Sequence, residues 1–155
     1  MRITEILPPK SIYVDEGGVV RGKPDALRVL AELLAPALGC EGEAIERLLA
    51  ERERLQSTGI GDGVAIPHTS LEAAGRRAAA LVVCAPGILF DSIDGGKVNI
   101  VLGVVGPKDA TGEHLRVLAR ISRMLRDEGT RKALAHAKSP AEAYGIIEAR
   151  EQQLG

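Results

Sequence analysis

The stretches Ala79–Ala85 (AALVVCA) and Val98–Val105 (VNIVLGVV) decide the fold, because they are apolar runs of strand length rich in β-branched valine and isoleucine. Such runs are typical of strands buried on both faces. They predict two central strands of one sheet, with the segment between them forming loops and turns. Shorter extended pieces are predicted at residues 11–14 (SIYV) and 64–67 (VAIP), since Ile66 precedes a proline and avoids the α region.

Amphipathic segments alternate with these strands and predict helices. Pro36 is expected to end or kink the first of them. Thr111 is a candidate N-cap and Gly129 a candidate C′ glycine for a long helix after the second strand, while Ser139 and Pro140 begin the last helix. The order of elements predicts one α/β domain over all 155 residues, with the sheet covered on both faces. The predicted helices span residues 23–39, 41–56, 111–129, 130–137 and 139–152.

Composition excludes several classes of function. Hydrophobic residues make up 45% of the chain and charged residues 26%, which favours a packed core over disorder. The absence of Trp, with two Tyr and one Phe, argues against an aromatic platform for stacking nucleic-acid bases. A formal net charge of −1 provides no general attraction to nucleic acid or to an anionic membrane. The apolar runs are also too short to span a bilayer.

Cysteine usage and the N-terminus bear on where the protein works. The opening MRITEILPPK has no apolar h-region, so no secretory signal peptide is expected. Cys40 and Cys84 form no C-x-x-C motif and show no metal-ligand spacing. Two lone cysteines without an export signal are typical of a reducing compartment. The sequence therefore predicts a cytoplasmic protein without direct membrane insertion.

Two polar side chains fall on helix faces that should point toward the core. Arg52 shares a helical stripe with Ile45, Leu49 and Leu55, and His114 faces inward from the first turn of its helix. Free backbone N–H groups near a helix N-terminus favour a bound anion. Spacing alone nevertheless favours the ordinary interpretations, namely an arginine that extends its charge to solvent and a structural histidine bonded to a carbonyl.

A glycine-rich stretch, STGIGDGVAIPHT over residues 57–69, places His68 in a predicted loop just past a short strand. Ser57, Thr58 and the amides of Gly59–Gly63 could turn toward an anion. The stretch lacks the glycine spacing of a dinucleotide fingerprint and precedes a strand rather than a helix. A tight turn feeding a strand explains it equally well. Together with the two inward side chains, it predicts an anion site around an imidazole, whose neutral nitrogen is a nucleophile.

The segment RERLQSTGIGDGVAIPH (52–68) resembles the motif of the enzyme IIA domains of the bacterial phosphoenolpyruvate-dependent phosphotransferase system. The matching type is the fructose–mannitol type, which includes the nitrogen-regulatory IIA proteins. Downstream, GILFDSIDGGKVNIVLGVVGP is similar to the family's FD-x-x-DG-x-x-V segment, and TGEHLRVLARISRMLRD to its second histidine motif. The resemblance covers nearly the whole chain. It implies a mixed β-sheet flanked by helices on both faces, in agreement with a three-layer α/β fold.

The resemblance also implies roles and partners. It makes His68 the histidine phosphorylated on Nε2, with His114 supporting the phosphoryl group and Arg52 beside it. An HPr-type phosphocarrier protein would be the donor, and a IIB domain or a regulatory target protein the acceptor, with no metal or cofactor involved. The close match in the glycine-rich loop favours the nitrogen-regulatory type over the sugar-specific type. The supporting loop is expected to comprise Ser57, Thr58, Gly59 and Gly61.

Three other functions compete with a phosphohistidine carrier. An interaction module would keep the fold without using phosphotransfer, although His68, His114 and Arg52 are all present. A metal site on the two histidines would need acidic or cysteine ligands, which are not spaced near them. A thiol hydrolase pairing Cys84 with His68 conflicts with the apolar surroundings of Cys84. The carrier is therefore the leading hypothesis.

Overall fold

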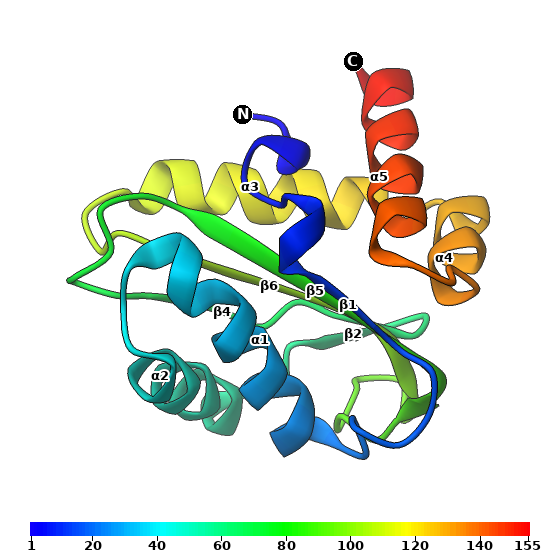
Figure 1. Cartoon of the computed structure of the whole chain (residues 1–155), viewed down its shortest axis with the longest axis horizontal. Helices are drawn as coiled ribbons and strands as arrows, with labels where there is room; N and C mark the ends of the chain where they lie inside the picture. The colour runs from blue at the N-terminus through cyan, green and yellow to red at the C-terminus, as the bar shows by residue number, and fades with distance from the viewer.

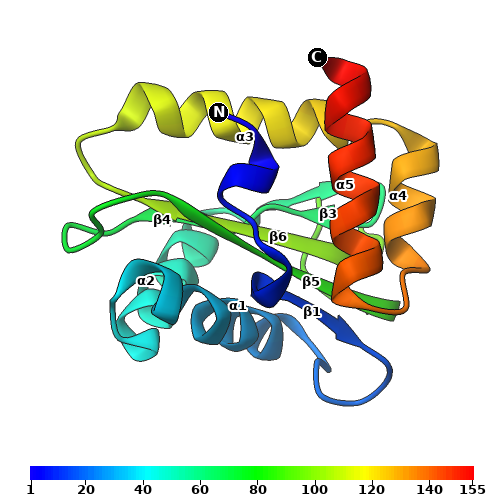
Figure 2. The same ribbon diagram turned by 45° about the horizontal axis from the view of Figure 1, so that its top comes forward.

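A computed structural model describes all 155 residues and contains one mixed sheet of six strands. The strand order is β1-β5-β6-β3-β2, with β4 also paired to β6. Helices α1 and α2 cover one face of the sheet, and α3, α4 and α5 cover the other (Figures 1 and 2), which confirms the predicted three-layer α/β fold. None of the helices combines the length and the apolar character that a membrane-spanning helix requires. The strands are β1 (Ile12–Asp15), β2 (Gly59–Gly61), β3 (Val64–Ala65), β4 (His68–Ser70), β5 (Ala78–Ile88) and β6 (Val98–Gly106). The helices are α1 (Lys23–Leu38), α2 (Gly42–Leu55), α3 (Thr111–Met124), α4 (Glu128–Ala135) and α5 (Pro140–Leu154), with short 3-10 helices at Ile3–Glu5 and Pro9–Ser11.

The two strands predicted from the apolar runs, β5 and β6, form the antiparallel centre of the sheet. Successive side chains of β5 enter two different cores, because a strand points alternate residues to opposite faces. Val82 packs in the core beneath α1 and α2, whereas Leu81 and Val83 pack beneath α3 and α5. Both faces are therefore apolar, which is why these strands appear in the sequence as continuous hydrophobic runs.

Two helices are predicted over residues 111–129 and 130–137, and the structure has two, but the boundary between them lies earlier in the chain. α3 ends at Met124, and α4 begins directly after Asp127, whose carboxylate accepts a hydrogen bond from the backbone N–H of Thr130 at 2.9 Å. Gly129, predicted as a C′ residue, lies inside α4. The prediction was wrong because Asp127 is a strong N-cap residue and starts a new helix before that glycine.

Other predicted boundaries lie within a few residues of the observed ones. Ser139 caps α5 with its side chain and Pro140 is the first helical residue, as predicted. Pro36 neither ends α1 nor marks its boundary, since the helix continues to Leu38. Because Pro36 lies in the last turn, the hydrogen bond that it removes is lost only near the helix end. Gly39 then closes α1 with a left-handed φ of 65°, a common C-terminal cap.

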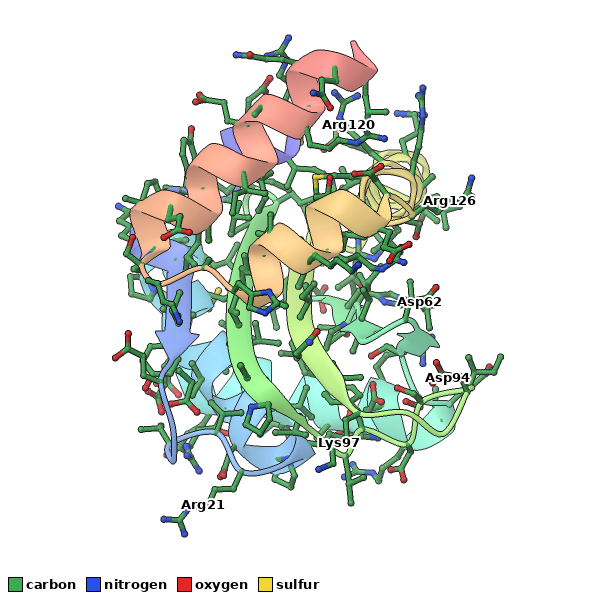
Figure 3. The ribbon with its side chains drawn as sticks, turned by 90° about the vertical axis from the view of Figure 1, so that its right-hand side faces the viewer. Arg21, Asp62, Asp94, Lys97, Arg120 and Arg126 are labelled. Atoms are coloured by element: carbon green, nitrogen blue, oxygen red, sulfur yellow. The ribbon has the colours of Figure 1, made fainter.

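The N-terminal segment is fastened to α5 by the buried carboxylate of Glu151. Glu151 accepts hydrogen bonds from the backbone N–H groups of Ile3 at 2.7 Å and Thr4 at 3.0 Å, and from the Thr4 hydroxyl at 3.1 Å. Arg120, which α3 presents near α5 (Figure 3), donates from Nε at 3.0 Å. Burial works to raise the pKa of Glu151, but these donors outweigh it and hold the pKa below its usual value.

We predict that Glu151→Gln lowers the free energy of unfolding by about 2 kcal/mol at pH 7, because glutamine retains only one acceptor oxygen and no charge. A depressed folded-state pKa contributes stability above the unfolded value of about 4.3, and this contribution is lost as pH falls through the folded value. The difference in free energy of unfolding between wild type and variant should therefore become smaller in acid. Urea unfolding at neutral and acidic pH measures it. Glu148→Gln, exposed on the same helix, is the control, and equal losses in both variants would contradict the prediction.

Candidate functional site

Arg52, His68 and His114 line one surface hollow of about 250 Å³. Arg52 comes from the last turn of α2, His68 from the start of β4 and His114 from the first turn of α3. These elements meet at the left of the views in Figures 1 and 2. The ring centroids of His68 and His114 are 5.7 Å apart. The three side chains that the sequence singled out separately thus occupy a single site.

His68 opens the strand β4 rather than lying in a loop, so that prediction was wrong. β4 runs parallel to β6, with His68 opposite Val104, and the Val104 N–H donates to the Pro67 carbonyl at 2.9 Å. β3 also runs parallel to β6 and pairs with an earlier part of it. β3 and β4 therefore lie along the same edge of β6, separated only by Ile66 and Pro67. The three residues of β4 are all polar, so the sequence shows no alternation of apolar and polar residues there. They form a strand only because they pair with β6.

The backbone sets the tautomer of His68. Its Nδ1 lies 2.8 Å from the carbonyl oxygen of Ile66, and because a carbonyl only accepts, Nδ1 carries the proton. Burial lowers the pKa of His68, and the Arg52 charge adds to this, while the Ile66 carbonyl and Glu53 act in the opposite direction. The net shift is downward. His68 is therefore a neutral imidazole at neutral pH, with the lone pair on Nε2.

The lowered pKa predicts how phosphoryl acceptance should depend on pH. Only the neutral ring has a lone pair on Nε2, so the rate should fall as His68 is protonated. Because the pKa lies below the usual value of about 6.5, the midpoint of the decline in rate should lie below pH 6.5. Phosphorylation by the small donor phosphoramidate, corrected for the titration of the donor, measures the profile. A midpoint at or above pH 6.5 would contradict it.

His114 is also neutral. Burial, the neighbouring His68 and the charge of Arg77 lower the pKa of His114 to about 4. Its Nδ1 is buried and has no hydrogen-bond partner in the protein. A second neutral imidazole can therefore support an anionic group by hydrogen bonding.

Arg77, which the sequence did not single out, is a buried cation behind His114. It pairs with Glu113 and donates to the Ala110 carbonyl at 3.2 Å, so it fastens the start of α3 to the sheet. Gly106 makes room for it, because a Cβ there would lie 2.8 Å from the Arg77 Nε. The only hint in the sequence is an arginine directly before the β5 run, which is too common a pattern to single out.

Arg52 faces the hollow, although only part of the predicted core-facing stripe of its helix is buried. Ile45 and Leu49 are buried as predicted, but Leu55 is 83% exposed. Glu53, four residues after Leu49, continues the buried face instead. One N–H of Arg52 donates to the Gln56 carbonyl at 2.9 Å, which holds the guanidinium at the end of α2. Arg52 is half-buried, so its guanidinium both lines the hollow and reaches solvent, which also fits the alternative interpretation.

The predicted loop residues Ser57, Thr58, Gly59 and Gly61 do not line the hollow. The Ser57 hydroxyl donates to the Phe90 carbonyl at 2.7 Å and accepts from the Gly59 N–H at 3.1 Å. The Thr58 hydroxyl donates to the Glu53 carboxylate at 2.7 Å. Both hydroxyls therefore hold the turn together within the protein.

The glycines of this turn allow a close approach of the 91–95 segment. A Cβ at Gly59 would lie 2.4 Å from the Ser92 hydroxyl, and Gly61 has a φ of 96°. The Asp62 N–H donates to the Asp94 carboxylate at 3.1 Å, and Figure 3 shows both residues at this edge of the sheet. The glycine-rich pattern thus has a packing cause.

Five further residues line the hollow and were not predicted as site residues. Thr111 is the first residue of α3 rather than its N-cap, since Ala110 occupies that position and no side chain caps the helix. Because a helix start leaves backbone N–H groups unpaired, this end of α3 favours an anion. Lys108 adds a cation from the loop between β6 and α3. The five additional lining residues are Thr69, Ser70, Pro107, Lys108 and Thr111.

The competing chemistries find little support in the geometry. No cluster of three or more His, Cys, Asp or Glu side chains is arranged to hold a metal ion. Burial and the nearby Asp15 raise the pKa of Cys84 to about 12, so its thiol stays protonated in the core beneath α1. The Cys84 thiol is therefore not a nucleophile of this hollow.

Comparison with known proteins places the fold and motifs in a family. The family model for the phosphoenolpyruvate-dependent sugar phosphotransferase system, EIIA 2, matches residues 5–150. A nitrogen regulatory protein from Klebsiella oxytoca is 36% identical over 128 residues, covering 82% of this chain and 79% of that protein. Another from Bradyrhizobium diazoefficiens is 33% identical over 147 residues, covering 95% of each. The crystal structure of nitrogen regulatory protein IIA-Ntr from Neisseria meningitidis has a TM-score of 0.85 at 31% identity, covering 94% of this chain and 98% of that one. The chain belongs to the EIIA 2 family of the phosphoenolpyruvate-dependent phosphotransferase system.

Proposed function

We propose that Nε2 of His68 accepts a phosphoryl group from the phosphohistidine of an HPr-type carrier protein. The observation that carries the proposal is the hydrogen bond from Nδ1 to the Ile66 carbonyl, which leaves Nε2 as the nucleophilic nitrogen in a hollow shared with Arg52 and His114. The Nε2 lone pair forms the new N–P bond as the donor's N–P bond breaks and its electron pair returns to the donor imidazole. Nδ1 keeps its proton, so the product is a phosphoimidazolium.

The surrounding groups stabilise the phosphoryl group in transit. A transferring phosphoryl group is loose and anionic, so oriented donors and cations supply most of the catalysis. Arg52 and Lys108 provide positive charge, the start of α3 provides backbone N–H groups, and His114 supports the group without a charge of its own. Ser57, Thr58, Gly59 and Gly61 act indirectly, by shaping the turn that precedes His68.

We place the protein with the nitrogen-regulatory members, in which phosphorylation of the IIA protein controls a regulatory target. The likeness to nitrogen regulatory proteins over nearly the whole chain supports this assignment. The sugar-specific alternative would pass the phosphoryl group to a IIB domain. Two results would support the regulatory assignment. The protein would keep its phosphoryl group in the presence of IIB domains, and it would bind a regulatory target with different affinity in its two phosphorylation states. Rapid transfer to a IIB domain contradicts it.

Intact-mass analysis tests the carrier chemistry. The protein is incubated with phosphoenolpyruvate, enzyme I and an HPr-type carrier, and the charged state of the carrier is verified separately. One acid-labile phosphoryl adduct is the expected result. An absence of adduct with several charged carriers and with phosphoramidate would overturn the proposal and leave an interaction module that keeps the fold without phosphotransfer.

A further inference from the structure

Glu53 is a buried carboxylate on α2, next to Arg52 in the sequence. Its two oxygens accept the Thr58 backbone N–H at 3.0 and 3.1 Å, and one of them accepts the Thr58 hydroxyl at 2.7 Å. Lys23 Nζ lies 3.0 Å from the carboxylate. Burying a charge is unfavourable unless it is paired and hydrogen-bonded, and Glu53 meets both conditions. Glu53 does not line the hollow, so its effect on His68 is indirect.

A continuous series of hydrogen bonds joins Glu53 to the His68 ring. Glu53 holds the N–H of Thr58, and the Thr58 carbonyl accepts the N–H of Ile66 at 3.0 Å. The Ile66 carbonyl then accepts the proton of His68 Nδ1 at 2.8 Å. Each link fixes the backbone of the next residue. The Glu53 carboxylate therefore helps to determine where the Ile66 carbonyl lies and which tautomer the ring adopts.

The same helix turn also positions the cation of the site. Arg52 faces the hollow directly, whereas its neighbour Glu53 holds the segment that leads to His68 through Thr58. The distance between guanidinium and imidazole thus depends on one rigid element, the end of α2. Misplacing reacting groups by about 1 Å can cost about 100-fold in rate, so this coupling is relevant to catalysis. The Glu53 charge also works against the lowering of the His68 pKa.

We infer that Glu53 is a positioning residue of phosphotransfer: through Thr58 and Ile66 it holds His68 as the Nδ1–H tautomer and in register with Arg52. The inference rests on the proposed function, because it takes His68 as the phosphoryl acceptor. Glu53 contacts neither the hollow nor the His68 ring, and it is the second residue of the RE pair that opens the motif before the glycine-rich loop.

Glu53→Gln tests this role. Glutamine has nearly the same shape, but it has one acceptor oxygen and no charge, so it cannot serve the Thr58 N–H, the Thr58 hydroxyl and Lys23 together. We expect the phosphorylation rate to fall about tenfold with both an HPr-type carrier and phosphoramidate, with KM for the carrier unchanged. Nitrogen-15 NMR should show a single Nδ1–H tautomer of His68 in wild type and a mixture in the variant. Glu51→Gln, exposed on the same helix, should match wild type in both measurements.

Thr58→Val provides an independent variant that removes the hydroxyl bond to Glu53 and keeps the backbone hydrogen bonds of Thr58. Its effect on the rate should be smaller than that of Glu53→Gln. The double variant should be less impaired than the product of the two single effects, because both substitutions weaken the same contact between Glu53 and Thr58. A wild-type rate and a single tautomer in folded Glu53→Gln would overturn the inference. If Glu53→Gln fails to fold, wild-type values for Thr58→Val would overturn it. A wild-type protein that cannot be phosphorylated would refute the proposed function instead, and the tautomer comparison would still decide whether Glu53 positions His68.

Discussion

Replacing His68 with asparagine is expected to abolish phosphorylation of the protein while leaving its fold intact. The Nδ2 of asparagine can take the place of Nδ1 and donate to the Ile66 carbonyl, so the local hydrogen bond survives. The variant has no counterpart of Nε2, and an amide nitrogen is not a nucleophile. Intact-mass analysis after incubation with a charged HPr-type carrier should show a phosphoryl adduct on wild type alone, and thermal unfolding should show similar midpoints.

His136→Asn is the matched control for this substitution. His136 is exposed on the surface just after α4, and its Nδ1 also lies 2.8 Å from a backbone carbonyl, that of Lys132. The two variants therefore make the same chemical change in similar local settings. His136→Asn should be phosphorylated like wild type. An adduct that persists in His68→Asn and disappears in His136→Asn would show that His136 is the phosphoryl acceptor. It would refute the assignment of the hollow as the site of phosphorylation.

The sequence predicts the parts of the fold that depend on local patterns. β5 and β6 are visible because burial on both faces demands apolar side chains at every position, and α5 because Ser139 and Pro140 give its start a local chemical cause. The extended piece predicted over residues 64–67 contains β3, whereas β2 and β4 are not visible, since each has only three residues. β2 pairs with β3 across a tight turn, and β4 is a strand only because it pairs with the distant β6, which no local window contains.

The candidate site is predictable to a similar degree. Arg52 and His114 attract attention because helical spacing turns a polar residue toward the core, a purely local signal. Lys108 lies in a loop without periodicity, so nothing in its surroundings points to the hollow. The glycine-rich turn has the composition of an anion-binding loop, but its glycines accommodate Ser92, Asp94 and Asn99. Composition cannot distinguish a glycine that faces a ligand from one that faces a neighbouring segment.

Replacing Arg52 with glutamine is expected to slow phosphorylation of His68 by about 100-fold without preventing it. The nucleophile and its tautomer are unchanged, but the developing negative charge on the phosphoryl group loses a cation that α2 holds at the edge of the hollow. Single-turnover rates with phosphoramidate measure this loss of charge stabilisation separately from carrier binding, because no carrier protein has to dock. Arg52→Lys should recover part of the rate, since it restores the charge without the planar pair of donors.

Arg54→Gln separates a local effect of Arg52 from a general effect of charge. Arg54 lies two residues further along the same helix, is exposed and lines a different surface pocket. Both variants replace an arginine with glutamine, so they change the net charge of the protein equally. If Arg52 acts on the phosphoryl group, only Arg52→Gln should be slow, and the loss should persist at high salt. If both variants slow equally and the loss vanishes as salt is added, the arginines merely attract anionic donors at long range. The positive charge that stabilises the transfer would then have to come from Lys108 and the start of α3, the only other electropositive groups of the hollow.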